Sequence, residues 1–134
     1  MRYLCLDLGD RYIGVAVSDA LGMIARPLEV FERTSRADDF AHVAALVKKH
    51  RALALIVGLP IQMDGVEGSQ AAWVRDYSAE LGETINVPVR LWDERLTTME
   101  AEDIMRARGR KPTKEWIDAV AAAVILQSYL DSQR

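Results

Sequence analysis

The chain has a single cysteine, Cys5, among its 134 residues. One cysteine excludes an internal disulfide and any zinc site built from cysteines, and its place between two leucines fits a small core residue. No apolar run approaches the roughly 20 residues of a membrane-spanning helix. The short apolar run after Arg2 stops at Asp7, which is not the pattern of a signal peptide. We therefore expect a cytoplasmic protein with no membrane partner.

Two common catalytic patterns are missing as well. The sequence contains no GxxxxGK[ST] phosphate loop and no Ser/His/Asp order, so neither P-loop chemistry nor acyl transfer has support. Hydrophobic residues make up 50% and charged residues 28% of the chain, which is ordinary for a globular protein. The length suits one domain over residues 1–134, with a sizeable core.

Positive charge is scarce overall but concentrated in one segment. The 17 basic and 20 acidic residues give a net charge of −3, which taken alone disfavours nucleic acid. Residues 106–114 nevertheless carry five basic side chains and no acid, directly before a helical pattern. A solvated loop and a nucleic-acid contact are both open interpretations of this run. For the second, the candidate contacts are Arg108, Arg110 and Lys111.

The apolar pattern alternates between strand and helix periods. Glycine and aspartate at 9–10 indicate a hairpin turn, and Pro27 favours an edge strand. Three strands followed by alternating helices and strands predict an α/β three-layer fold with a mixed sheet, whose later strands run parallel through right-handed crossovers. The expected strands are 3–8, 13–17, 23–31, 52–57 and 87–92, and the expected helices follow Ser35 and cover 70–81, 97–109 and 112–132.

Three acids stand where an acid is costly. Asp7 closes the first apolar run, Glu94 follows the last one, and Asp118 lies in an apolar helical pattern. In such sheets ligands sit beyond the carboxyl ends of the parallel strands, where we expect Asp7 and Glu94. Oxygen-only clusters suit hard cations such as Mg²⁺, which points to phosphate chemistry. An ordinary turn acid at Asp7 and a salt bridge at Asp118 remain alternatives.

In the segment Asp93-Glu94-Arg95, only one of the two acids can face Asp7, because neighbouring residues of an extended chain point to opposite sides. We favour Glu94 as the acid that faces Asp7, for its reach, and leave open whether Asp93 contributes. Arg95 can hold a phosphate or clamp a carboxylate. Gly14, in the middle of a strand, indicates a bulge or the close approach of another group.

Segments spread over nearly the whole chain resemble the YqgF/RuvX family of pre-16S rRNA nucleases, also described as Holliday-junction-resolvase-like. Two positions depart from the family pattern: Tyr12 replaces a basic residue, which leaves Arg11 to supply a phosphate contact there, and Gln62 stands where Asn is common. The matching segments are Asp7-Leu8-Gly9, Ile13-Gly14-Val15-Ala16-Val17-Ser18-Asp19, Val57-Gly58-Leu59-Pro60, Met63-Asp64-Gly65, Asp93-Glu94-Arg95-Leu96-Thr97-Thr98, and Asp118 followed by Ala121-Ala122, Ile125-Leu126-Gln127 and Tyr129-Leu130-Asp131.

The resemblance implies an RNase H-like fold with a five-stranded mixed sheet, and a nuclease that uses Mg²⁺ or Mn²⁺. Asp7 would bridge two metals, with Glu94 and Asp118 each completing one, for in-line attack by water. The implied substrate is the 5′ end of pre-16S rRNA in ribosome biogenesis. A resolvase acting on structured DNA and a non-catalytic RNA-binding assembly factor are the alternatives. The protein would be a monomer or a homodimer.

The strand order of that fold, 3-2-1-4-5, raises one difficulty. Glu94 follows the fifth strand, two spacings from the first, which is about 9–10 Å. The fourth strand, between them, ends in Val57-Gly58-Leu59-Pro60 and offers no acid. Glu94 must therefore lean across the gap, and we expect weak catalysis by the isolated protein.

Overall fold

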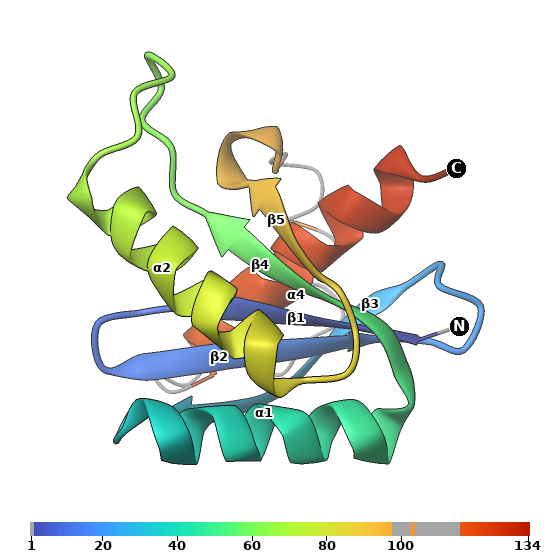
Figure 1. The fold of residues 1–134 in the computed structure, drawn as a ribbon. Coiled ribbons are helices and arrows are strands. Elements are labelled where there is room, and N and C mark those ends of the chain that lie inside the picture. Colours follow the sequence, from blue (N-terminus) through green and yellow to red (C-terminus); the bar gives the residue numbers. More distant parts are fainter. Residues whose placement is uncertain (1, 98–102, 104–115) are drawn as a thin grey trace.

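A computed structural model describes residues 2–97, 103 and 116–134 of the chain. Its strands form one mixed five-stranded sheet in the order β3-β2-β1-β4-β5 (Figure 1), which confirms the predicted fold class and order. The strands are β1 (Arg2–Leu8), β2 (Tyr12–Ser18), β3 (Ala25–Glu32), β4 (Ala52–Leu59) and β5 (Val89–Asp93).

The pairing of the strands decides which edge of the sheet can hold a site. β1 and β2 form the predicted antiparallel hairpin, closed by a hydrogen bond from the Gly9 amide to the Tyr12 carbonyl at 3.0 Å. β4 and β5 run parallel to β1. The carboxyl ends of β1, β4 and β5 consequently meet at one edge of the sheet.

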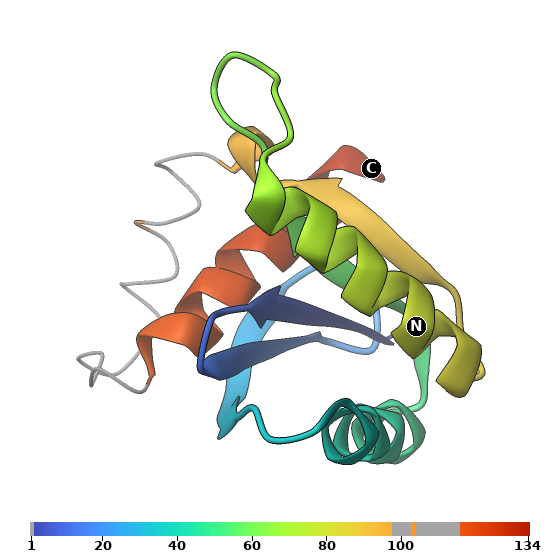
Figure 2. The same cartoon turned by 60° about the vertical axis from the view of Figure 1, so that its left-hand side comes forward.

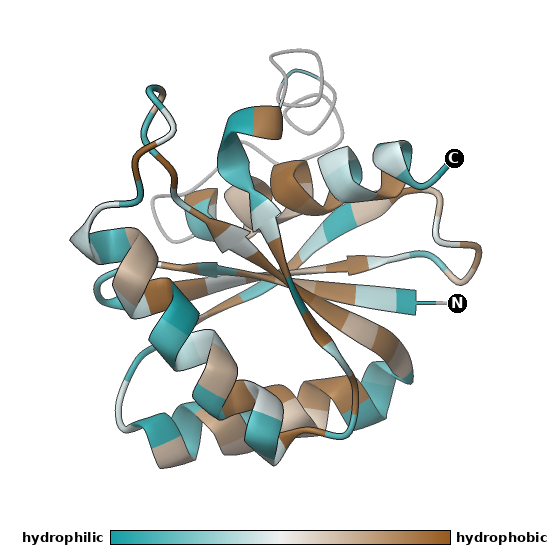
Figure 3. Cartoon of the chain, turned by 45° about the horizontal axis from the view of Figure 1, so that its top comes forward, coloured by the Kyte–Doolittle hydropathy of each residue, from teal (hydrophilic) through white to brown (hydrophobic). Residues whose placement is uncertain are grey.

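Helices cover both faces of the sheet (Figure 2). Helices α1 (Arg36–His50) and α2 (Ser69–Thr84) pack on one face, where Leu4, Leu6 and Leu8 of β1 point. Helix α4 (Ile117–Ser132) packs on the other face, against Cys5. Strand alternation places Asp7 on the same face as Cys5, toward α4. Hydrophobic residues dominate the strands, while the helices mix both kinds (Figure 3).

Local signals in the sequence account for several boundaries. The Ser35 side chain accepts a hydrogen bond from the Asp38 amide at 3.1 Å and caps α1, as predicted. Pro27 lies in the edge strand β3, beside a register shift in its pairing with β2. This strand begins two residues later than predicted, because residues 19–24 form a turn in which the Asp19 carboxylate accepts from two backbone amides.

The helices after β4 differ from the predicted ones in their bounds, or lie partly outside the described residues. Helix α2 begins at Ser69 and continues to Thr84, beyond the predicted end at residue 81. Except for residues 97 and 103, the predicted helix 97–109 lies outside the described residues, as does the predicted start of the last helix at 112. Within the described part of the chain, no helix has the length and apolar character to cross a bilayer.

Candidate active site

Asp7 lies near the carboxyl end of β1 between two glycines. On one side it pairs with Gly14 of β2. On the other side Leu6 pairs with Val57 of β4, so that Gly58 follows at the level of Asp7. Neither neighbouring strand therefore places a side chain beside the Asp7 carboxylate on the α4 face.

Gly14 allows helix α4 to approach the sheet. A Cβ atom at Gly14 would lie 1.9 Å from the Asp118 carbonyl oxygen and 2.8 Å from the Ala119 nitrogen. Backbone atoms of the first turn of α4 thus occupy the space that any side chain at this position would fill. This contact, the close approach that a glycine in mid-strand predicted, holds Asp118 near the β1–β2 hairpin.

Gly58 leaves room for the Glu94 side chain, as Gly14 leaves room for the backbone of α4. A Cβ atom at Gly58 would lie 2.7 Å from Glu94 Oε1 and 3.2 Å from its Cγ. The Glu94 side chain therefore lies over β4, the strand that separates β5 from β1. In this way Glu94 crosses the two-strand gap that the sequence predicted, and it approaches Asp7 without any acid on β4.

The carboxylates of Asp7 and Glu94 are half-buried and repel each other. Burial raises the pKa of Asp7 to about 7, helped by the charges of Glu94 and then Asp118. The pKa of Glu94 is also raised, mainly by burial and then by Asp93. Among the described residues, no cation pairs with the Asp7 carboxylate and no donor is hydrogen-bonded to it. The negative charge gathered here is thus uncompensated by the described part of the chain.

Cys5 lies on the same face of β1, two residues before Asp7. Burial raises the pKa of its thiol, and the charges of Asp7 and Glu94 raise it further. A buried neutral thiol is a poor nucleophile. Its position in the apolar cluster under α4 agrees with the core role expected from the sequence.

The donor set fits a hard cation in its chemistry. Asp7 and Glu94 supply carboxylate oxygens, which Mg²⁺ and Mn²⁺ prefer, and two glycines keep the space beside them free of side chains. The described residues do not, however, gather three acidic, histidine or cysteine side chains within reach of one ion. Asp118 is thus a neighbour whose charge is felt at Asp7, and the structure does not bring it together with the other two as a finished metal cage.

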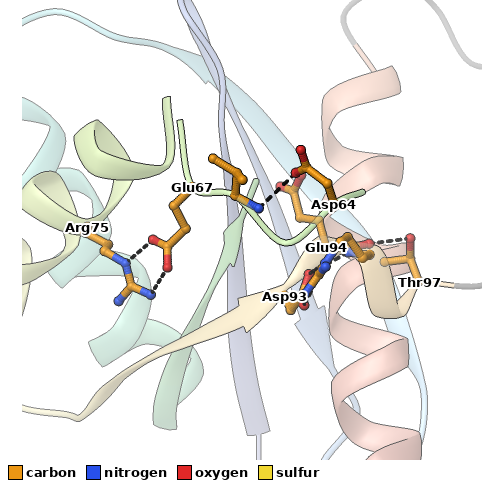
Figure 4. A network of polar contacts seen from close by, with 8 residues as sticks. Asp64, Glu67, Arg75, Asp93, Glu94 and Thr97 are labelled. Carbon is orange, nitrogen blue, oxygen red and sulfur yellow. Dashed lines mark hydrogen bonds and ion pairs between the residues drawn. The ribbon is translucent and has the colours of Figure 1, made fainter. Parts of the chain in front are cut away.

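Asp93 and Arg95, which flank Glu94, pair with each other. Figure 4 shows Asp93, Glu94 and Thr97 at this turn after β5. The guanidinium of Arg95 donates to both carboxylate oxygens of Asp93, with its Nη2 at 2.8 Å. Asp93 also accepts from the Arg95 amide at 2.9 Å, and Thr97 closes the turn with a 2.8 Å bond to the Glu94 carbonyl. Asp93 is consequently held away from Asp7, whereas Glu94 is directed over β4.

The structure describes two of the five residues that we predicted to contact nucleic acid. Arg95 is exposed beside the loop between β4 and α2, where a Cβ at Gly65 would lie 3.7 Å from its Nη1. Arg11 is exposed in the β1–β2 turn and makes one surface ion pair with Glu32 at 3.3 Å. Arg108, Arg110 and Lys111 lie outside the described residues.

Sequence reasoning missed the part played by Gly58. The pattern Val57-Gly58-Leu59-Pro60 indicated only the end of a strand. The available signal was a glycine at the end of a buried apolar run, a position that often marks close approach by another group. Which group approaches could not be read from the sequence, because Glu94 is 36 positions away.

Solved structures with a similar fold include two complexes with Holliday junction DNA. A structure titled "T. thermophilus RuvC in complex with Holliday junction substrate" superposes with a TM-score of 0.68 at 18% identity, covering 99% of this chain and 96% of that one. The complex of the fowlpox virus resolvase with junction DNA gives a TM-score of 0.59 at 12% identity, with 99% of both chains covered. At these identities the likeness establishes the RNase H-like fold alone.

Relatives by sequence are closer. A protein of Thermoanaerobacter pseudethanolicus named "Putative pre-16S rRNA nuclease" is 42% identical over 137 aligned positions, covering 100% of this chain and 99% of its own. A protein of the same name from an Anaeromyxobacter strain is 44% identical, with 99% and 98% covered. The model of the RuvX family, described as Holliday junction resolvase, matches residues 1–132. This chain is therefore a member of the RuvX family.

Proposed function

We propose that this protein is a divalent-metal-dependent nuclease that hydrolyses phosphodiester bonds in structured RNA, at the 5′ end of a 16S rRNA precursor. The observation that carries the proposal is the pair of half-buried carboxylates, Asp7 and Glu94, brought together over Gly58. Relatives at 42–44% identity carry the name of such a nuclease. A ribosomal RNA precursor is a cytoplasmic molecule in bacteria, so the proposal places the protein in the cytoplasm.

Each acid has a part in this mechanism. A Mg²⁺ or Mn²⁺ ion bound here would supply positive charge for the phosphodiester and activate a water molecule. Asp7 and Glu94 would provide oxygen ligands, and Asp118 would add a third carboxylate from α4. In the metal-free protein the pKa of Asp7 is about 7, so below neutral pH a proton competes with the metal ion for this carboxylate. We expect cleavage to require more metal as the pH falls below 7.

A DNA junction resolvase is the second candidate function. It is favoured by the family model, which is described as Holliday junction resolvase, and by the junction DNA bound in the two similar structures described above. A non-catalytic RNA-binding factor is the third, and it requires only that the acids hold a structural ion.

One experiment separates the three. The same preparation is incubated with a labelled pre-16S rRNA fragment and with a four-way DNA junction, each with Mg²⁺, Mn²⁺ or EDTA. Wild type and Asp7→Asn are compared. We expect metal-dependent cleavage of the RNA that Asp7→Asn reduces by roughly a thousandfold, on the scale of removing one key charge-stabilising group from an active site.

The alternatives give different patterns in this assay. Cleavage of the junction alone would support the resolvase. An absence of cleavage, with RNA binding equal in wild type and Asp7→Asn, would support the assembly factor. Asp93→Asn is the matched control, since Asp93 pairs with Arg95 and is held away from Asp7. Its loss should leave most of the activity.

A further inference from the structure

A cavity opens where β1 ends, on the face of the sheet that carries α1 and α2. Its volume is about 390 Å³, within the range of small-molecule sites. It is lined by the turn of residues 8–10 that directly follows Asp7, by Arg33 after β3, and by the first turn of α2 with Gln70 and Trp73. The cavity is thus next to Asp7 in the sequence, but it lies on the opposite face of the sheet, past the carboxyl end of β1.

Arg33 gives this cavity a positive charge. Its Nη1 donates to the carbonyl oxygens of Gly9 at 3.0 Å and Asp10 at 2.8 Å, and its guanidinium lies 4.2 Å from the centre of the Trp73 ring. Its Nε–H is buried and has no hydrogen-bond partner among the described residues. No carboxylate of the described chain forms an ion pair with it.

A neighbouring arginine shows what is unusual about Arg33. Arg36 also lies over the Trp73 ring, at 5.9 Å. Unlike Arg33, it forms ion pairs with Asp76, at 2.9 Å, and with Glu80. The charge of Arg36 is therefore neutralised within the fold, whereas the partners of Arg33 among the described residues are carbonyl oxygens and an aromatic face.

The start of helix α2 adds to the positive potential. This helix has 16 residues, its N-cap Gly68 supplies no side-chain hydrogen bond, and its first turn contains no acid. Glu67, directly before the N-cap, has its carboxylate paired with Arg75. Within the described residues, no side chain caps this end of the helix, and such an end favours anions. Among the described residues that line the cavity, Asp10 is the one acid, and its backbone carbonyl oxygen accepts from Arg33.

We propose that this cavity binds a phosphate of the nucleic-acid strand whose scissile bond lies at Asp7. The inference rests on the proposed nuclease function and extends it: the strand passes over the carboxyl edge of the sheet at Gly9 and places a neighbouring phosphodiester between Arg33 and the first turn of α2. A half-buried guanidinium that no carboxylate of the described chain neutralises and a helix N-terminus are both suited to phosphate oxygens.

The test uses Gln70→Glu, which adds a negative charge inside the cavity. Gln70 is exposed in the first turn of α2, where an acid favours the helix, so the variant should fold. Binding of a fluorescein-labelled single-stranded RNA 12-mer is measured by anisotropy in EDTA, where no cleavage occurs. We expect about tenfold weaker binding at low salt. The dependence of log affinity on log salt should fall by about 0.7, the value for one phosphate contact of a single strand.

Two further variants make the test specific. Gln133→Glu, at the exposed far end of α4, makes the same chemical change away from the cavity and should bind RNA like wild type. Arg33→Lys keeps the charge but loses the planar fork, and should weaken binding by less than Gln70→Glu does. Equal RNA affinity for Gln70→Glu and Gln133→Glu overturns the inference, as does a wild type that fails to bind the 12-mer.

Inorganic phosphate distinguishes a strand phosphate from a free anion. If Gln70→Glu weakens binding of inorganic phosphate and leaves RNA binding unchanged, the cavity is a free-anion site and the inference is wrong. The proposed nuclease function is judged separately, by metal-dependent cleavage and its loss in Asp7→Asn. If the protein does not cleave RNA but Gln70→Glu weakens RNA binding as predicted, the phosphate site in the cavity is supported and the nuclease function is rejected.

Discussion

Glu94 reaches toward Asp7 because Gly58 has no side chain. Its Oε1 lies 2.7 Å from the position that a Cβ on Gly58 would occupy. The acid after β5 is thereby brought across β4, toward the acid of β1. The distance between the first and fifth strands, which led us to expect weak catalysis, is spanned by one long side chain lying over a glycine. The weak catalysis itself remains a prediction.

The variant Gly58→Ala should separate activity from stability. The added methyl would press on Glu94 Oε1 and on Ile125 Cδ1, at 2.8 Å. Both are ends of side chains that can move, so we expect a loss of only about 1 kcal/mol in the free energy of unfolding. Displacing Glu94 should lower the cleavage rate about tenfold to a hundredfold. Cleavage kinetics and urea unfolding measure the two effects.

Gly82→Ala is the matched control for that variant. Gly82 is exposed in α2, and the nearest atom to an added Cβ would be Val89 Cγ2 at 3.6 Å. Alanine should stabilise the helix by about 0.5 kcal/mol and leave cleavage unchanged. If Gly58→Ala cleaves RNA as fast as Gly82→Ala, Glu94 does not act from its position over β4.

Gly14→Ala should mainly affect stability. Here the added methyl would meet the backbone carbonyl of Asp118 at 1.9 Å, and neither β2 nor α4 can move aside without losing packing. We expect the free energy of unfolding to fall by about 3 kcal/mol, measured by urea denaturation. A loss no larger than that of Gly58→Ala would contradict the close contact between α4 and β2.

The Asp7 carboxylate should destabilise the metal-free protein at alkaline pH. Its folded-state pKa of about 7 lies above the ordinary value of about 3.9, so the folded state binds the proton more tightly. The cost is absent below about pH 4, grows as the pH rises, and is complete above about pH 7. With allowance for solvent screening, Asp7→Asn should raise the free energy of unfolding by about 2 kcal/mol at pH 8.

The same comparison at pH 5 is the internal control, because about two thirds of the cost has then disappeared and Asp7→Asn should be more stable than wild type by only about 0.7 kcal/mol. Thermal unfolding in EDTA at both pH values gives the difference directly. A stabilisation of the variant that is as large at pH 5 as at pH 8 would show that removing the charge is not its cause.

Mg²⁺ or Mn²⁺ should stabilise wild type but not Asp7→Asn. An ion that binds only the folded state adds about 2.7 kcal/mol at a hundred times its dissociation constant, and here it also relieves the repulsion between Asp7 and Glu94. The measurement is the melting temperature at pH 8 over a range of metal concentrations. An equal rise in both proteins would place the bound ion elsewhere.

The basic run at residues 106–114 should contribute to nucleic-acid affinity. Removing two of its charges, in R110Q/K111Q, should weaken RNA binding at low salt and reduce the salt dependence by about 1.4, twice the value for one phosphate. The matched control is K48Q/K49Q, since Lys48 and Lys49 are exposed in the last turn of α1, which precedes the amino end of β4. If anisotropy titrations give the same RNA affinity for R110Q/K111Q and K48Q/K49Q, the basic run does not contact nucleic acid and the solvated-loop interpretation holds.

The sequence by itself determined the order of strands and helices and the three acids worth testing. Periodicity is local, so alternating leucines around Cys5 and a capping Ser35 were enough to place strand and helix. The family resemblance added the strand order and the RNase H-like fold, both of which the structure has. An acid that ends a buried strand is also visible locally, because it interrupts an apolar run.

Only the tertiary structure decided what surrounds those acids. It placed Gly58 under Glu94, paired Asp93 with Arg95, and set Arg33 on Trp73 beside the turn that follows Asp7. These contacts join residues up to 40 positions apart, and no local pattern encodes them. They arise because parallel strands end at one edge of the sheet, where side chains distant in sequence share a small, partly buried space.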